Sequence, residues 1–345
     1  MASTVGSCAS SASAPGRSPS KEGRRFCGAS AFAVARSRLA VDGTHKTDDD
    51  RRMTRAGLLV ASVAVLVMVA SAQSRPSSGV IAFQVYVQRN NTSDGIYLTN
   101  ADGGGLHRLQ NQPPNSFGPR WSPDGRRLLI VSLGRSSIRL FVIGAEGGNR
   151  RLVLSGHRAG QTPGYADWSP DGTRIAVLRG TPCTRSFLCN ASLYVFSLSS
   201  GAQDRIAHGV LGLSPPAWAP NGRLIAFAGE TGGLFVVSPN GDSQRQITGG
   251  FGAWPVWSPD GRSIAFTLLG KRTRTYTVGL DGRDRQLLLA GDSAAVSWSH
   301  DGKRIAFTRG SYSGDLYTAD GDGGHATRIT RDRRDETLPD WQPQP

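Results

Sequence analysis

At 345 residues the chain is long enough for two average domains or for one repeat array. Its 44 Gly, 19 Pro and 7 Trp favour many turns and short strands and argue against a fold of long helices. The formal net charge is +14, of which residues 73–345 carry +9. A basic protein attracts polyanions, but the charges are scattered through the chain, so charge alone identifies no partner.

Three regions are expected along the chain: a prefix over 1–52, an export signal over 53–72 and a folded domain over 73–345. The prefix is rich in Ser, Ala, Gly and Arg and lacks sustained apolar periodicity, which is typical of disorder. Met53 stands directly before the signal, so translation that begins there would make the prefix a mis-called extension. The alternative is an organellar transit peptide, since Glu22 is the only acidic residue among the first forty.

The segment 57–72 is an unbroken apolar stretch that follows three arginines and ends in Ala70-Ser71-Ala72. A basic start, a short apolar centre and a small-x-small ending are the parts of a secretory signal peptide. Sixteen residues is shorter than the roughly 20 that a spanning helix needs. We expect cleavage after Ala72, with a retained membrane tether through 57–72 as the alternative. The folded part is therefore expected in the periplasm, at the cell surface or outside the cell, or else in an organellar lumen.

A tryptophan motif then recurs along the chain, with successive Trp residues 47, 50, 39, 41 and 43 positions apart. This is the period of one four-stranded propeller blade. The copies are Trp121-Ser-Pro-Asp124-Gly125, Trp168-Ser-Pro-Asp171-Gly172, Trp218-Ala-Pro-Asn221-Gly222, Trp257-Ser-Pro-Asp260-Gly261, Trp298-Ser-His300-Asp301-Gly302 and a truncated Trp341-Gln-Pro343.

Each motif predicts a strand that carries the Trp (A), a turn, and then three further strands (B, C and D). The B strand begins seven residues after the Trp, as in Ile264-Ala-Phe266, and the C strand has an aromatic second position, as in Leu316-Tyr317. Strands B, C and D occur six times, starting at Ile81, whereas no A strand precedes Ile81. The sixth A strand must therefore come from Leu338–Trp341 and close the first blade, which predicts an all-β, six-bladed propeller.

The repeated residues have structural explanations. A Trp buried between blades contributes a large apolar area, while Pro, Asp and Gly are the residues that a hairpin turn between A and B requires. Because Asp124, Asp171, Asp260 and Asp301 recur at one position, turn stabilisation explains them better than metal binding or catalysis. Cys183 and Cys189, with five residues between them in a polar loop, are expected to form a disulfide; metal ligation is the less favoured alternative because no His lies near them.

The repeat resembles that of the TolB-like propeller family, whose blades carry W-S-P-D-G-x-x-I-A-F. The resemblance extends over about 78–345 and implies the propeller fold, but it says little about function because propellers support many unrelated activities. TolB itself has an α/β domain before its propeller, whereas here about five residues separate Ala72 from the first strand. Membership of a Tol–Pal envelope complex is therefore not implied.

No catalytic motif emerges. The sequence contains no G-x-S-x-G pentapeptide, which a hydrolase of the prolyl-peptidase type would need in a further α/β domain. The expected function is therefore non-catalytic binding of a protein or peptide by an exported monomer, with no cofactor, metal or nucleic acid. The candidate ligand-binding residues lie in the D-to-A connections, which rim the channel of a propeller, and combine aromatic and charged groups: His157, Arg158, Tyr165, Phe251, Trp254, Arg333 and Asp335.

Two other functions stay open. One is an enzyme of the polysaccharide lyase or lactone hydrolase type, with a metal held in the channel by His157 and His208. The other is a binder of cell-wall carbohydrate that uses Tyr165, Trp254 and Arg333.

Overall fold

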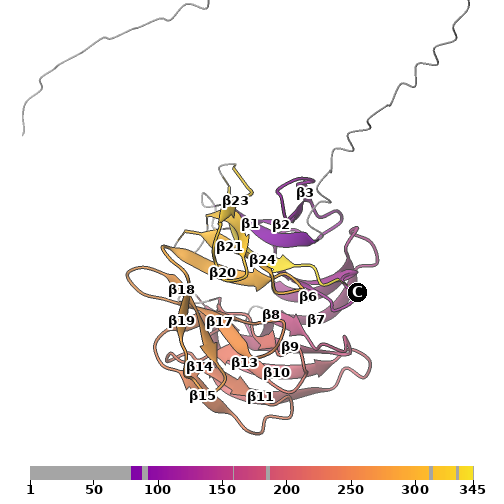
Figure 1. Cartoon of the computed structure of the whole chain (residues 1–345). Helices are drawn as coiled ribbons and strands as arrows, with labels where there is room; N and C mark the ends of the chain where they lie inside the picture. Colours follow the sequence, from indigo (N-terminus) through magenta and orange to yellow (C-terminus); the bar gives the residue numbers. More distant parts are fainter. Residues whose placement is uncertain are drawn as a thin grey trace, which may run out of the picture. The chain divides into compact units, whose positions relative to one another are not determined.

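The computed structural model describes residues 79–87, 92–157, 159–183, 187–310, 314–331 and 334–344. The predicted prefix, the export signal and their boundaries lie outside these ranges. Within the described residues, twenty-four strands form six four-stranded antiparallel sheets, and no helix suited to crossing a membrane is found there. The sheets are the blades of a propeller (Figure 1).

The first three blades each run from an A strand to a D strand. Blade 1 contains β24 (Asp335–Trp341), β1 (Val80–Val87), β2 (Thr92–Asn100) and β3 (His107–Arg108). Blade 2 contains β4 (Ser116–Trp121), β5 (Arg127–Leu133), β6 (Ser137–Gly144) and β7 (Arg151–His157). Blade 3 contains β8 (Thr162–Trp168), β9 (Arg174–Pro182), β10 (Leu188–Ser197) and β11 (Gln203–Val210).

The other three blades repeat this order. Blade 4 contains β12 (Ala217–Trp218), β13 (Ile225–Ala228), β14 (Leu234–Val237) and β15 (Arg245–Thr248). Blade 5 contains β16 (Gly252–Trp257), β17 (Ser263–Leu268), β18 (Arg274–Gly279) and β19 (Gln286–Leu289). Blade 6 contains β20 (Ser293–Trp298), β21 (Arg304–Arg309), β22 (Asp315–Asp320) and β23 (Thr327–Arg328).

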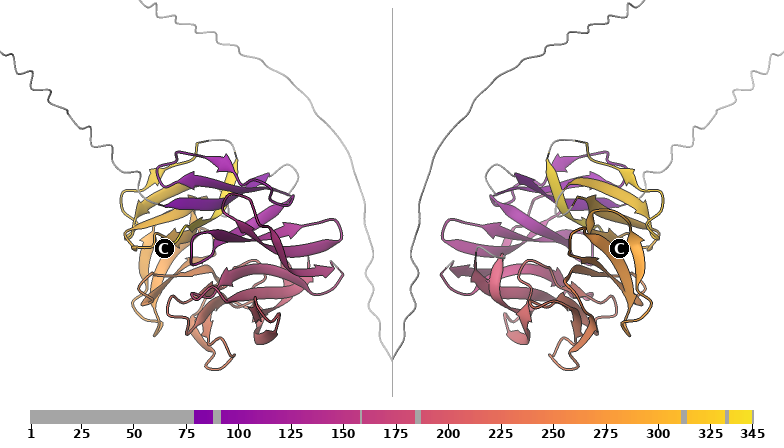
Figure 2. Two further views of the ribbon diagram at one scale, coloured as in Figure 1. Left: turned by 90° about the vertical axis from the view of Figure 1, so that its right-hand side faces the viewer. Right: turned by 90° about the vertical axis from the view of Figure 1, so that its left-hand side faces the viewer.

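The ring closes in blade 1, where the last strand pairs with the first. Strand β24 lies antiparallel to β1, with Trp341 opposite Ile81 and Asp340 opposite Ala82. Figure 2 shows the indigo start and the yellow end of the propeller in the same blade. Each A strand also contacts the A strand of the next blade, including β20 with β24 and β24 with β4, so the A strands surround the central axis. The predicted six blades and their closure are confirmed.

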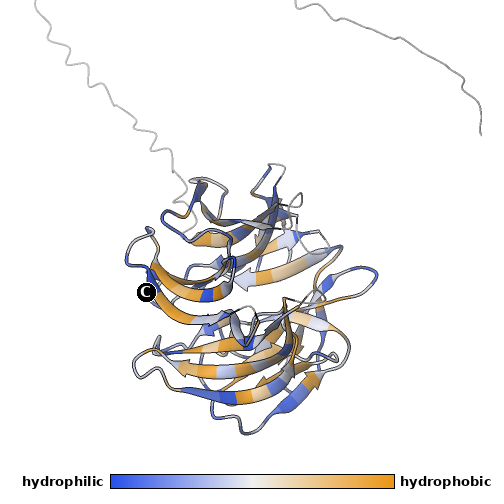
Figure 3. Ribbon diagram, turned by 180° about the vertical axis from the view of Figure 1, so that it is seen from behind, coloured by the Kyte–Doolittle hydropathy of each residue, from blue (hydrophilic) through white to orange (hydrophobic). Residues whose placement is uncertain are grey.

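The apolar core lies between neighbouring blades, where the motif Trp residues pack. Trp298 is half-buried, and the other five are 4–5% exposed. Trp121, for example, packs with Ile96 and Leu98 of the preceding blade. Its indole N–H donates to the carbonyl of Asp340, 3.1 Å away, and Trp168 donates in the same way to Arg120 at 3.2 Å. Trp121 and Trp168 therefore each join two blades by apolar burial and by a hydrogen bond. Figure 3 shows the apolar residues concentrated in the strands.

The four repeated aspartates stabilise the turn between strands A and B. In blade 3, Asp171 accepts hydrogen bonds from the Ser169 hydroxyl at 2.6 Å and from the Thr173 backbone N–H at 2.9 Å. These two bonds favour the ionised carboxylate and lower the pKa of Asp171 to about 2. The equivalent bonds from a serine hydroxyl and a backbone N–H also occur at Asp124, Asp260 and Asp301.

The predicted disulfide is present. It joins Cys183, in the connection between β9 and β10 of blade 3, to Cys189, the second residue of β10. The bond closes a short loop whose residue Phe187 packs against Phe117 and Tyr165, with ring centroids 4.9 and 5.5 Å apart.

Candidate functional site

The connections of the propeller divide between two faces. Because successive strands run in opposite directions, the B–C and D–A connections lie at one end of each blade, and the A–B and C–D turns at the other. We call these ends the loop face and the turn face. The predicted ligand-binding residues that the structure describes lie at or near the loop face: His157 ends the D strand β7, Phe251 lies in a D–A connection, and Tyr165, Trp254 and Asp335 lie in A strands.

A bulge in several A strands directs side chains towards the axis at the loop face. The position three residues before the Trp has a left-handed backbone at Gly118, Trp254, Ala295 and Leu338, with φ between 51° and 61°. The pairing of these strands with their B strands shifts register at the same place. Trp254, Ala295 and Leu338 come from three different blades and pack into one cluster, which Tyr165 of a fourth blade joins. Side chains from four blades can meet only at the axis.

We call this cluster of Trp254, Ala295, Leu338 and Tyr165 the axial plug. It closes the loop-face end of the channel. Trp254 is 9% exposed and Leu338 is 5% exposed, and Leu211 and Leu213 pack against them. The Trp254 backbone N–H donates to the Ser214 hydroxyl at 2.8 Å, which ties the bulge of blade 5 to the connection of blade 4. Beneath the plug, the space that Arg120, Tyr165 and Leu338 line has no room for a water molecule. A ligand that approaches this face therefore meets a closed surface.

The predicted site residues separate into two groups. Tyr165 and Trp254 lie in the axial plug, where burial also raises the pKa of Tyr165. Phe251, at 56% exposure, and His157 lie on the exposed rim, and Asp335 is half-buried at the start of β24. The structure thus does not bring the predicted residues together as one site. Arg158 and Arg333 lie outside the described residues.

An ionic cluster lies inside the ring, at positions directly before the Trp of three blades. The Asp340 carboxylate accepts hydrogen bonds from the Trp121 backbone N–H at 2.6 Å and from the Arg120 guanidinium at 3.2 Å. Asp167 accepts a hydrogen bond from the Trp218 N–H at 2.7 Å. Burial raises the pKa of Asp340 to about 6 and also raises the pKa of Asp167, although the Arg120 charge opposes both shifts. These hydrogen bonds link neighbouring blades.

Sequence reasoning missed this cluster because the search for charges covered the connections only. The sequence does contain a sign of it, because three of the six residues directly before the motif Trp are charged. These six residues are Arg120, Asp167, Ala217, Val256, Ser297 and Asp340. Charged residues at a buried, repeated strand position are rare unless they are paired.

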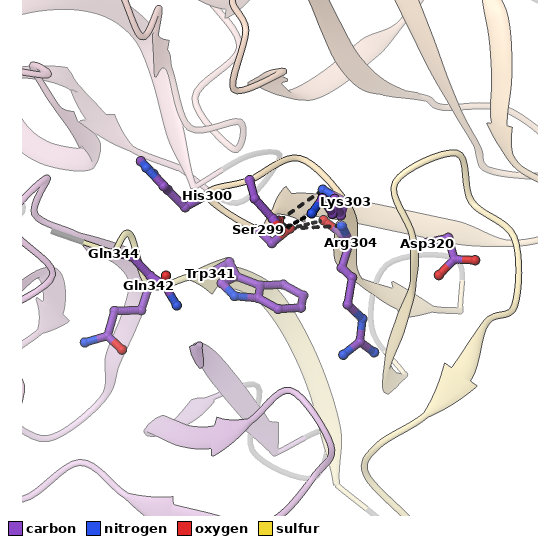
Figure 4. A pocket seen from close by; sticks show the side chains of 9 residues that line it. Ser299, His300, Lys303, Arg304, Asp320, Trp341, Gln342 and Gln344 are labelled. Carbon is purple, nitrogen blue, oxygen red and sulfur yellow. Dashed lines mark hydrogen bonds and ion pairs between the residues drawn. The ribbon is translucent and has the colours of Figure 1, made fainter. Parts of the chain in front are cut away.

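A hollow of about 420 Å³ lies on the turn face, at the closure seam between blades 6 and 1. Figure 4 shows Trp341 in it, between Gln342 and Arg304. The Arg304 guanidinium lies over the Trp341 ring at 5.8 Å, and Lys303 lies 3.9 Å from Asp301. Since its aromatic ring is covered and its charges are paired, this hollow offers a ligand few free groups.

A second hollow, of about 350 Å³, lies on the loop face in the B–C connection of blade 5. Leu268, Leu269 and Tyr276 contribute apolar surface, and Lys271, Arg272 and Arg274 are exposed around it. The Leu269 backbone N–H donates to the Phe251 carbonyl at 2.8 Å, which places the hollow beside the exposed Phe251. Sequence reasoning missed these cations because it considered only the D–A connections.

The family model described as the TolB β-propeller domain matches residues 63–254, which is more than half of the chain. The chain belongs to this family. TolB from Acinetobacter baumannii has a similar structure, with a TM-score of 0.64 at 19% identity over 78% of this chain and 68% of that one. A putative TolB from Agrobacterium tumefaciens gives a TM-score of 0.56 at 18% identity over 75% and 91%. Identities this low indicate the shared propeller fold and nothing more.

A curated relative of this TolB β-propeller chain is an uncharacterized peptidase, YuxL, of Bacillus subtilis. The two are 27% identical over 85 residues, which are 24% of this chain and 13% of that protein. The matched part of the TolB β-propeller chain thus corresponds to a small fraction of the relative.

Metal binding was a feature of the alternative enzymatic function. In the described part of the chain, no group of three or more His, Cys, Asp or Glu is placed to hold a metal ion. His157 and His208 are both exposed, in β7 and β11 respectively.

Proposed function

We propose that this TolB β-propeller chain is an exported, non-catalytic protein that binds a protein or peptide on its loop face. The observation that carries the proposal is the axial plug. Tyr165, Trp254 and Leu338 fill the axis, so the loop face offers no deep channel for a small substrate. It offers instead a broad closed surface with an exposed aromatic residue, Phe251, and free cations at its rim.

The disulfide supports export, because disulfides persist in oxidising compartments and are rare in the cytosol. The predicted signal over 53–72 agrees with this location. Exposed aromatic and basic residues on a rigid scaffold are the usual components of a protein-binding surface. No arrangement of a nucleophile, a base and an electrophilic group has emerged from the described residues.

Selection of peptides from a phage-displayed random library tests the proposal. We expect the immobilised protein to enrich peptides, Phe251→Asp to abolish this enrichment, and Lys303→Glu on the turn face to leave it unchanged. Enrichment that is equal for all three proteins would contradict loop-face binding. Metal analysis of the purified protein is a second test, because stoichiometric Mn, Ca or Zn would favour the enzymatic alternative.

A further inference from the structure

The hollow of blade 5 lies at a repeat position whose residue differs between blades. In blades 3 and 6 the eleventh residue after the Trp is an arginine at the end of the B strand. Arg179 lies over the Tyr194 ring at 5.7 Å, and Arg309 lies over the Tyr317 ring at 4.7 Å. In these two blades a guanidinium group thus covers the ring of the aromatic residue of the C strand.

Blade 5 has Leu268 at this position, which pairs with Arg274, while the equivalent aromatic residue Tyr276 pairs with Phe266 two residues earlier in the B strand. Tyr276 is instead stacked by Arg285, whose guanidinium lies at 5.0 Å and comes from the segment after the C–D turn. Tyr276 lines the hollow together with Leu268 and Leu269. Blade 5 thus has an apolar side chain beside the hollow at the position where blades 3 and 6 have a stacked cation.

Three cations surround this recess. Lys271, Arg272 and Arg274 are exposed, and we find no hydrogen bond or ion pair from their side chains to any other described residue. The acidic group bonded to this loop is Asp292, whose carboxylate accepts a hydrogen bond from the Thr273 backbone N–H at 3.2 Å. The recess therefore combines apolar walls with an excess of positive charge.

We propose that the blade 5 hollow binds an acidic peptide segment that carries one large apolar side chain. The apolar side chain enters between Leu268 and Tyr276 and contacts Phe251, while the flanking carboxylates of the peptide pair with Lys271, Arg272 and Arg274. The inference rests on the proposed peptide-binding function of the loop face and specifies the ligand of that surface. A concave recess of about 350 Å³ fits a single inserted side chain better than it fits a flat lipid surface.

The test is fluorescence anisotropy of the full protein with three labelled pentapeptides: Glu-Asp-Phe-Asp-Glu, its uncharged analogue Gln-Asn-Phe-Asn-Gln, and Glu-Asp-Gly-Asp-Glu. We expect the first peptide to bind roughly tenfold more tightly than either of the others. The second peptide lacks the carboxylates that pair with the cations, and the third lacks the apolar side chain that enters the recess. The K271E/R272E variant should lose this preference, whereas K303E on the turn face should keep it.

Leu268→Arg is the more specific variant, because it restores the residue that blades 3 and 6 carry and so is compatible with the fold. We expect it to weaken binding of the Phe-containing acidic peptide to the level of the Gly-containing one, with unchanged thermal stability. Unchanged selectivity in Leu268→Arg would overturn the assignment of the recess.

The two proposals fail in different ways. If phage selection on the loop face succeeds but the acidic and uncharged peptides bind equally, the acidic ligand is wrong and loop-face binding stands. If phosphatidylserine vesicles bind the protein, and K271E/R272E abolishes that binding without affecting the peptides, the surface recognises anionic membranes and the peptide assignment is wrong. If neither library nor peptide binds, the proposed function itself fails.

Discussion

Replacement of Asp340 by Asn tests the ionic cluster at the ring closure. In the wild type, Arg120 is the one cation among the described residues that acts on both Asp340 and Asp167, and the side chains of Arg120 and Asp340 are only 12% and 16% exposed. Two mostly buried carboxylates near one guanidinium leave a net negative charge in a poorly solvated place. An Asn at position 340 keeps an oxygen that can accept the hydrogen bond from the Trp121 N–H and removes that charge.

The raised pKa of Asp340 sets the size and the pH range of the effect. A carboxyl whose pKa rises from 3.8 to about 6 on folding favours the folded state when it is protonated. The free energy of unfolding should therefore fall as the pH rises from about 4 to about 6. A shift of about two pKa units corresponds to at most about 3 kcal/mol. The repeated turn aspartates have lowered pKa values, so their contribution is lost below pH 4 and lies outside this range.

Urea unfolding, followed by tryptophan fluorescence at pH 4, 5, 6 and 8, measures the effect. We expect Asp340→Asn to match the wild type near pH 4 and to exceed its free energy of unfolding by up to about 3 kcal/mol at pH 8. Arg120→Met should have the opposite effect, costing about 3–5 kcal/mol, because it leaves two buried carboxylates without a cation. Lys303→Met, which removes an exposed pair, should change stability by less than about 1 kcal/mol.

One result would refute this reasoning. If Asp340→Asn destabilises the protein by similar amounts at pH 4 and pH 8, its hydrogen bonds outweigh the cost of its buried charge. The ionic cluster would then stabilise the folded state at both pH values, and it would not make the free energy of unfolding depend on pH.

Three further predictions concern the closure, the disulfide and one surface pair. Trp341→Ala should lower the free energy of unfolding by about 3–5 kcal/mol in urea titrations, because it empties the site that joins blades 6 and 1; a loss below 1 kcal/mol would show that closure does not depend on this side chain. Replacement of Cys183 and Cys189 by Ser should cost roughly 2 kcal/mol by calorimetry, with no further loss when reductant is added. The Asp320 carboxylate lies 2.6 Å from His325 and raises the histidine pKa above 6.5, so NMR titration should show that pKa falling in Asp320→Asn.

Much of the fold follows from local patterns that repeat. The spacing of Trp121, Trp168 and their later equivalents predicts the blades, because each blade is one local unit whose strands pair with chain neighbours. The missing A strand before Ile81 predicts the closure by Trp341, since an unpaired sheet edge is unfavourable. The disulfide follows from two cysteines with five residues between them in one loop.

The site depended on tertiary structure. Phe251 and Trp254 are aromatic residues three positions apart in one connection, yet the first is 56% exposed and the second is 9% exposed. The difference arises from the left-handed backbone of Trp254 at the bulge, which turns its side chain to the axis, where it meets Leu338 from another blade. Similarly, the order of residues shows that Arg120, Asp167 and Asp340 stand directly before tryptophans, but only the closed ring places the three charges together. Contacts at the axis join residues over two hundred positions apart, and no local pattern encodes which side chains meet there.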